Sequence, residues 1–142
     1  MDIVSMINDK INKLAKLNMI SGVQPSDLAD NIYLENYHSM SSYKNYNCII
    51  FELTFEEEID NIKTTTLLRY IYNTEKVLYR IEEEINGEIM IQWDREIIER
   101  QLINDMVDLL NQHFSKKQVD KFLSTVPLYL KEKILTKLNM VA

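Results

Sequence analysis

An Asn-Gly pair, Asn86-Gly87, lies at the centre of a stretch in which apolar and charged residues alternate, from Ile81 to Ile91. Asn-Gly between two alternating segments is the strongest short-range signal for a β-hairpin, because both residues tolerate the positive φ of a tight turn. The pair therefore predicts antiparallel sheet in the middle of the chain. Since the flanking segments have helical periodicity, the sequence predicts an α+β fold.

Other segments beside the hairpin also have the composition of strands. They alternate apolar and polar residues or are rich in β-branched and aromatic side chains. Together they predict an antiparallel β-meander of three to four strands over about residues 48–93. The predicted strands are 48–55, 64–72, 76–84 and 88–93. A partly helical structure for residues 56–84 stays open, since some of their apolar residues also recur at helical spacing.

The pairing register follows from the loop that brings apolar side chains to one face, because a slip of one residue reverses every side chain. A two-residue turn at Asn86-Gly87 would mix apolar and charged residues. A three-residue loop over 85–87 separates them, pairing Ile81 with Ile91. We therefore expect the three-residue loop, with Gly87 at its positive-φ position.

The same reasoning predicts a two-residue loop at residues 73–74. The meander then has one largely apolar face, on which Glu83 is the charged exception near the hairpin tip. The apolar residues predicted for this face are Leu68, Tyr70, Val77, Tyr79, Ile81, Ile91 and Trp93.

Amphipathic helices are predicted on both sides of the meander. Residues 2–17 carry an apolar stripe at spacings of three and four, and Asp2 can cap their start. A long helix is predicted over 97–114, and Ser115 and Pro127 mark the starts of two further helices. We expect the N-terminal and long helices to pack against the sheet and the chain to end in a helical hairpin. A chain of 142 residues fits a single domain, 1–142.

The charge of the chain is unevenly distributed. The net charge is −6, with −9 on residues 52–108 and +4 on residues 115–142. An acidic body disfavours non-specific binding to nucleic acid, which needs clustered Lys and Arg. The split is instead suited to a basic end that meets an acidic surface, on this chain or on a partner, and a partner of this kind could be basic.

The sequence contains no motif for a cofactor, a metal or catalysis. The two glycines are isolated, and the two histidines have no partner ligands at helical spacing. Cys48 is the single cysteine, which excludes an internal disulfide. Without a secretory signal or a long apolar run, we expect a cytoplasmic protein that has no cofactor, is not an enzyme and does not span a membrane.

The most promising partner-binding residues lie in a tyrosine-rich segment and on the predicted acidic strand. Tyrosine offers a large contact area at low entropic cost, and surface carboxylates attract basic partners. The candidate partner-binding residues are Tyr37, His38, Tyr43, Tyr46, Glu82 and Glu84. The alternative is that the tyrosines cover an edge of the sheet.

A small acidic chain without catalytic motifs is typical of a non-catalytic, protein-binding regulatory protein of a bacterium or phage. An inhibitor, immunity factor, adaptor or chaperone-like protein belongs to this class, and a homodimer is compatible with it. Two alternatives remain. One is a small enzyme that brings together at least two of Glu52, Glu83, Glu88 and His38 in a pocket. The other is an acidic mimic of nucleic acid.

Overall fold

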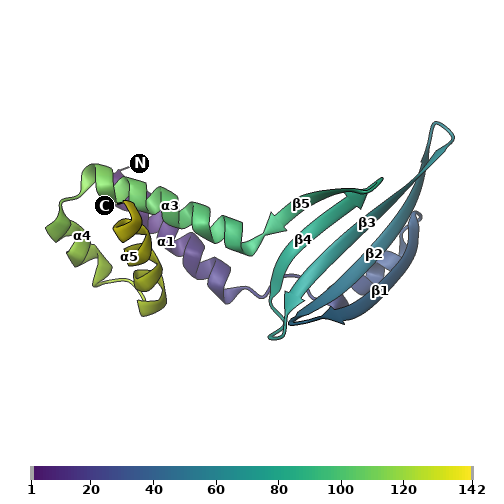
Figure 1. Ribbon diagram of the computed structural model, residues 1–142, viewed down its shortest axis with the longest axis horizontal. Helices are drawn as coiled ribbons and strands as arrows, with labels where there is room; N and C mark the ends of the chain where they lie inside the picture. The colour runs from purple at the N-terminus through teal and green to yellow at the C-terminus, as the bar shows by residue number, and fades with distance from the viewer. Residues whose placement is uncertain (1, 142) are drawn as a thin grey trace. The chain divides into compact units, whose positions relative to one another are not determined.

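The structure, a computed structural model, describes residues 2–141, with side chains described for residues 2–139. The predicted α+β class is confirmed, with a sheet of five strands where three to four were predicted. The elements are α1 (Ile3–Met19), α2 (Pro25–Leu28), a 3-10 helix η1 (Ala29–Tyr33), β1 (Tyr37–Asn45), β2 (Cys48–Ile59), β3 (Ile62–Asn73), β4 (Leu78–Ile85), β5 (Glu88–Asp94), α3 (Arg95–His113), α4 (Lys116–Leu123) and α5 (Leu128–Val141) (Figure 1).

The chain divides into two compact units, each with its own buried core. A helical unit comprises Met1–Met19 and Ile97–Ala142, and a sheet unit comprises Ile20–Glu96. The interpretation of residues 1–142 as one domain stays a prediction, for which cooperative unfolding of both units is the test.

The helical unit buries the apolar stripes of its helices in one shared core. Ile7 and Leu14 of α1 are buried with Met106 and Leu110 of α3 and with Ile134 of α5. The sequence analysis assigned the stripes of α1 and α3 to the sheet, whereas their buried residues belong to this helical core.

The helix starts follow the predicted signals. Asp2 caps α1, since its Oδ1 accepts a hydrogen bond of 2.7 Å from the Ser5 amide. Ser115 and Gln118 form the predicted capping box at α4. The short helix α2 begins at Pro25, in the first turn where proline is tolerated.

The sheet unit is a five-stranded antiparallel meander in sequence order, β1-β2-β3-β4-β5 (Figure 1). Residues 56–84, for which a partly helical structure was left open, are strand except for their turns. The added strand is β1, in a region whose low apolar content disguised it in the sequence. The long β2–β3 hairpin turns at Asp60 and Asn61, whose φ values of 54° and 65° suit a tight two-residue turn.

The predicted register of the β4–β5 hairpin is wrong. The turn contains two residues, Asn86 and Gly87, with φ values of 53° and 82°, and Ile85 pairs with Glu88. Glu82 consequently lies opposite Ile91, the mixed pairing that the sequence analysis rejected. Two positive φ values give the turn the twist that its strands need, which outweighs the segregation of side chains. A bulge at Gln92 then restores the alternation.

The predicted β3–β4 loop is also wrong. β3 ends at Asn73 and β4 starts at Leu78, so the connection is longer than the predicted two residues. The Asn73 side chain stabilises it by accepting hydrogen bonds from the amides of Glu75 and Val77.

These corrections change which residues share a face. We call the side that carries Leu53 and Leu68 the core face and the opposite side the network face. Glu83 lies across from Leu68, so its predicted place on the largely apolar face is confirmed. Four of the seven apolar residues predicted for that face belong to it by register: Leu68, Tyr70, Ile81 and Trp93. The other three do not. Val77 lies in the β3–β4 loop, Tyr79 lies at a bulge, and Ile91 lies opposite Glu82 on the network face.

The segment that precedes the strands covers part of the core face. Leu28 of α2 is buried against Leu53 and Phe55, and the Tyr72 hydroxyl donates a hydrogen bond of 2.6 Å to the carbonyl of Val23. Gly22 allows the close approach, since its φ is +87° and an added Cβ would lie 2.7 Å from Leu78 Cβ.

Candidate binding surface on the sheet

Strand β5 forms one edge of the sheet and exposes three consecutive apolar side chains. Ile89, Met90 and Ile91 are 54%, 59% and 50% exposed. Within the described residues β5 pairs with β4 alone. Native proteins usually protect a strand edge with lysine, proline, a bulge or a covering segment, because an unprotected edge is a template for another strand. Residues 88–91 have none of the first three, since the bulge of β5 comes later, at Gln92.

The hairpin geometry determines which backbone groups face outward from β5. In a two-residue hairpin the closing pair, here Ile85 and Glu88, is hydrogen-bonded, and hydrogen-bonded pairs alternate with non-hydrogen-bonded pairs. Met90 therefore bonds to β4, whereas the amides and carbonyls of Ile89 and Ile91 point away from it. We call the outward side of residues 88–91 the open edge.

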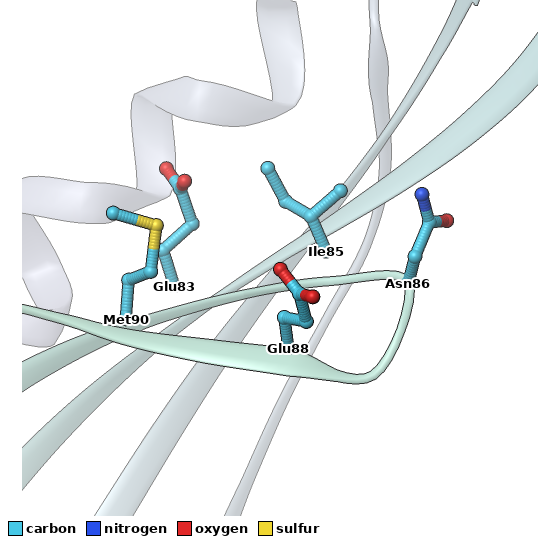
Figure 2. A pocket seen from close by; sticks show the side chains of 5 residues that line it. All are labelled: Glu83, Ile85, Asn86, Glu88 and Met90. Atoms are coloured by element: carbon cyan, nitrogen blue, oxygen red, sulfur yellow. The ribbon is translucent and has the colours of Figure 1, made fainter.

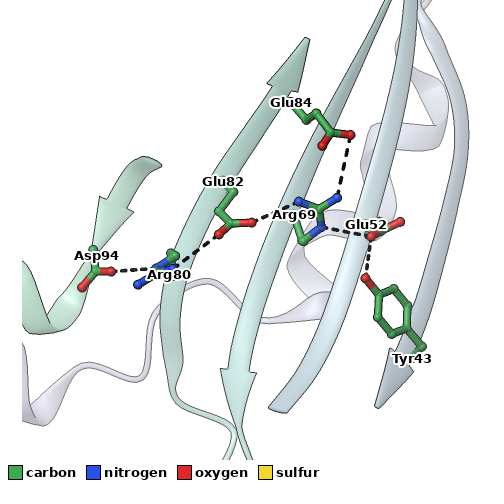
Figure 3. A network of polar contacts seen from close by, with 7 residues as sticks. All are labelled: Tyr43, Glu52, Arg69, Arg80, Glu82, Glu84 and Asp94. Atoms are coloured by element: carbon green, nitrogen blue, oxygen red, sulfur yellow. Dashed lines mark hydrogen bonds and ion pairs between the residues drawn. The ribbon is translucent and has the colours of Figure 1, made fainter. Parts of the chain in front are cut away.

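A polar network crosses all five strands on the network face (Figure 3). At its centre Arg69 of β3 donates hydrogen bonds of 3.1 Å to Glu52 and 3.0 Å to Glu82. The network ends at Tyr43 of β1, whose hydroxyl donates to Glu52 at 2.8 Å. On the other side, Arg80 Nε donates to Asp94 at 2.7 Å and Arg80 Nη1 to Glu82 at 3.5 Å, and Glu84 lies 4.0 Å from Arg69.

Each carboxylate of this network has a cationic neighbour. The Arg69 side chain is 17% exposed and Glu82 15% exposed, so both charges are largely removed from water. Burial lowers the pKa of Arg69, but its hydrogen bonds to Glu52 and Glu82 outweigh burial and raise the pKa above its ordinary value. The hydrogen bond to Glu52 likewise raises the pKa of Tyr43. Two arginines therefore serve four carboxylates, and their shared contacts tie the strands together.

The core face has a cavity at the tip of the β4–β5 hairpin (Figure 2). Its volume is about 300 Å³, and we call it the tip cavity. The lining side chains, which rise from the same side of the hairpin, are Glu83, Ile85, Asn86, Glu88 and Met90. Among residues 2–139, no lysine, arginine or histidine forms an ion pair with Glu83 or Glu88.

The tip cavity suits a cation with an apolar stem. Two carboxylates can accept hydrogen bonds from an ammonium or guanidinium group, while Ile85 and Met90 offer apolar contact. The lining residues include no histidine, serine or cysteine that could join the carboxylates in acid–base or nucleophilic chemistry. The cavity does bring together Glu83 and Glu88, two of the residues that the enzyme alternative required.

The six predicted partner-binding residues do not form one cluster. Tyr43, Glu82 and Glu84 meet on the network face through Arg69 (Figure 3). Tyr37 packs against the sheet core, His38 lies 3.6 Å from Glu56, and Tyr46 is almost fully exposed in the β1–β2 turn. Their role in partner binding stays a prediction.

The sequence analysis missed Arg69, Arg80 and the open edge as parts of this surface. The arginines face their carboxylates only in the correct strand register, so their spacing along the sequence carried no signal. The open edge did have one, since Ile89, Met90 and Ile91 are three successive apolar residues next to the turn. Such a run is typical of a strand whose two faces are both buried, whereas in β5 its three side chains are exposed.

No family model, curated protein or solved structure matches this chain. Among the described residues, no group of three His, Cys, Asp or Glu side chains is arranged to bind a metal ion. The described helices include none with the length and apolar composition needed to span a membrane. The argument for function therefore depends on the sheet itself.

Proposed function

We propose that this is a non-catalytic protein-binding protein that captures an extended segment of a partner along β5. The observation that carries the proposal is the open edge, where the exposed, apolar Ile89, Met90 and Ile91 accompany outward-facing backbone groups. An added strand would gain main-chain hydrogen bonds and would bury these side chains, as in other cases of β-strand addition.

The charge of the sheet unit supports a basic partner. Residues 20–96 contain 15 acidic and 6 basic side chains, a net charge of −9. A field of this sign speeds the encounter with a cationic protein and disfavours nucleic acid. On the network face, carboxylates are interleaved with Arg69 and Arg80, which supports protein binding over an acidic mimic of nucleic acid.

The biological role proposed with this activity is regulatory. Capture of a partner segment is the action of an inhibitor, immunity factor, adaptor or chaperone-like protein, here in the cytoplasm of a bacterium or in a phage-infected cell. Tyr43 of β1 and Tyr46 of the β1–β2 turn are a separate candidate contact, because both are exposed at the opposite edge of the sheet from β5.

Selection from a peptide library displayed on phage tests the proposal. The full chain is compared with the edge variant Ile89→Lys/Ile91→Lys and with the control Ile59→Lys/Ile62→Lys, whose isoleucines are 60% and 66% exposed at the β2–β3 turn. We expect the wild type and the control to enrich the same peptides and the edge variant to lose them.

A second edge variant, Ile91→Pro, removes an outward amide without adding charge and is tolerated at strand edges. Circular dichroism shows whether each variant keeps its fold. Equal capture of the same peptides by a folded edge variant would refute binding along β5.

A further inference from the structure

We infer that the segment added to β5 carries a lysine or arginine between two apolar residues, and that this cation enters the tip cavity. The inference rests on the proposed function and specifies the chemistry of the partner. It follows from three features of the open edge: the alternation of its faces, the difference between carboxylates that have a cationic neighbour and those that have none, and the position of the cavity.

Alternation determines where each partner side chain lies. Residues directly opposite each other in neighbouring strands share a face of the sheet. Partner residues opposite Ile89 and Ile91 would therefore lie on the network face, and the residue between them, opposite Met90, would lie on the core face. This holds for either direction of the added strand.

The network face next to β5 favours apolar partner residues. Ile89 and Ile91 lie opposite Glu84 and Glu82 of β4, and each of those carboxylates already has a guanidinium neighbour, Arg69 or Arg80. A partner cation on this side would compete with guanidinium groups that are already in place. Apolar residues would instead cover the exposed isoleucine side chains.

The core face next to β5 favours a cation. Met90 lies across from Glu83, and Glu88 is two residues away on the same face of β5. A lysine or arginine opposite Met90 would lay its methylene stem along the methionine and reach the Glu83 and Glu88 carboxylates at the tip cavity (Figure 2). Neither carboxylate has an ion pair within the described residues, so the partner would supply the missing charge.

A second copy of this chain is a poorer occupant of the open edge. Two β5 strands paired about Met90 would bring two acidic sheet units together, each with a net charge of −9. Met90 of one copy would also lie opposite Met90 of the other, so neither copy would bring a cation to Glu83 and Glu88. Charge complementarity therefore selects a basic segment.

Short synthetic peptides test the inference on the full chain. The probes are acetyl-Thr-Val-Lys-Val-Thr-amide and its analogues with norleucine or glutamate in place of lysine. Trp93, the single tryptophan, lies in β5 and reports binding by its fluorescence. Amide hydrogen exchange at Ile89 and Ile91 reports whether the peptide pairs with the edge.

We expect the lysine peptide to slow exchange at both amides and to bind about tenfold more tightly than the norleucine peptide, with the glutamate peptide weakest. In the variant Glu83→Gln/Glu88→Gln the preference for lysine over norleucine should fall below about twofold. The control Glu58→Gln/Glu75→Gln makes the same change in net charge away from the cavity and should keep the preference.

The outcomes separate this inference from the proposed function. If the lysine and norleucine peptides protect both amides and bind with equal affinity, the inferred preference for a cation is wrong, whereas capture of a segment along β5 is supported. Failure of all three peptides to protect the amides overturns both proposals. Protection that grows with protein concentration in the absence of peptide assigns the edge to a second copy and overturns the inference.

Discussion

The two edges of the sheet are built differently. β1 has three serines, a lysine and a bulge between Tyr37 and Ser39, and Met40 on its core face packs against the sheet core. β5 exposes Ile89, Met90 and Ile91 and has no cation in the same stretch. Lysine, polar residues and bulges are the usual means of preventing unwanted strand pairing.

The comparison supports β5, rather than β1, as the edge that we propose receives a partner. The segment that covers the core face, residues 23–28, contacts the region of β2 and β3, whereas the tip cavity lies beside β4 and β5. One edge has protective features and the other lacks them, which is the arrangement that the proposed strand addition requires. Four experiments test this contrast, in order of decreasing effect.

The largest expected effect comes from breaking the network that connects the two edges. Arg69→Ala leaves Glu52 and Glu82 largely buried without their central cation and should lower the free energy of unfolding by about 3 kcal/mol. Urea denaturation followed by circular dichroism measures this loss. Lys63→Ala, at an exposed position of the same strand, should change stability by less than about 0.5 kcal/mol. A similar loss in both variants would mean that the network does not connect the edges.

An alkaline titration should weaken the covered side of the sheet through Tyr72. Burial raises the pKa of Tyr72 from 10.0 to about 12. The unfolded chain therefore releases this proton first as pH rises, so the contribution is constant below about pH 9 and declines above pH 10. The loss should reach about 1.4 kcal/mol at pH 11.

Denaturation at pH 9 and pH 11 measures this decline. Tyr72→Phe should show a smaller decline than the wild type, although it starts from lower stability because the Val23 carbonyl loses its donor. Tyr33→Phe, at an exposed position, is the control and should follow the wild type. If stability declined as much in Tyr72→Phe as in the wild type, the decline could not be assigned to the Tyr72 hydroxyl.

The next largest effect on stability is expected at the turn between β4 and β5. Gly87 has a φ of +82° and no atom near an added Cβ, so Gly87→Ala should cost about 1 kcal/mol through backbone strain alone. Thermal unfolding checks the value. A loss of stability near zero would indicate that the turn is not the two-residue turn described above. In that case the conclusion that the amides of Ile89 and Ile91 point outward would also be wrong.

Substitutions that exchange the protective features of the two edges should change how much hydrophobic dye the protein binds, with little effect on its stability. Ile89→Lys adds a cation to β5, and Lys44→Ile removes the one on β1. Both should stay within about 0.5 kcal/mol of the wild type. Binding of a hydrophobic dye should fall in Ile89→Lys and rise in Lys44→Ile. Changes in the same direction in both variants would show that the edges are equivalent.

Local signals in the sequence predicted most elements of this fold. Asn86-Gly87, the Ser115 capping box and Asp2 act through neighbouring residues, so each was visible without knowledge of the tertiary structure. β1 was harder to recognise because an edge strand with polar residues on its exposed side lacks the apolar alternation of an internal strand.

The register and the site could be predicted only in part. The sequence analysis assumed uninterrupted strands, and the bulge at Gln92 lets a two-residue turn coexist with the pairing of Ile81 and Trp93. Glu82 was identified, but its bond to Arg69 spans 13 residues of sequence and depends on register. The division of the apolar stripes between two cores is likewise a tertiary property.

Amide hydrogen exchange in the full chain without any peptide tests the central claim most directly. If β5 is an open edge in the register described, the amides of Ile89 and Ile91 exchange about a hundredfold faster than that of Met90, which bonds to β4. Protection of Ile89 and Ile91 equal to that of Met90 in dilute solution would contradict the account.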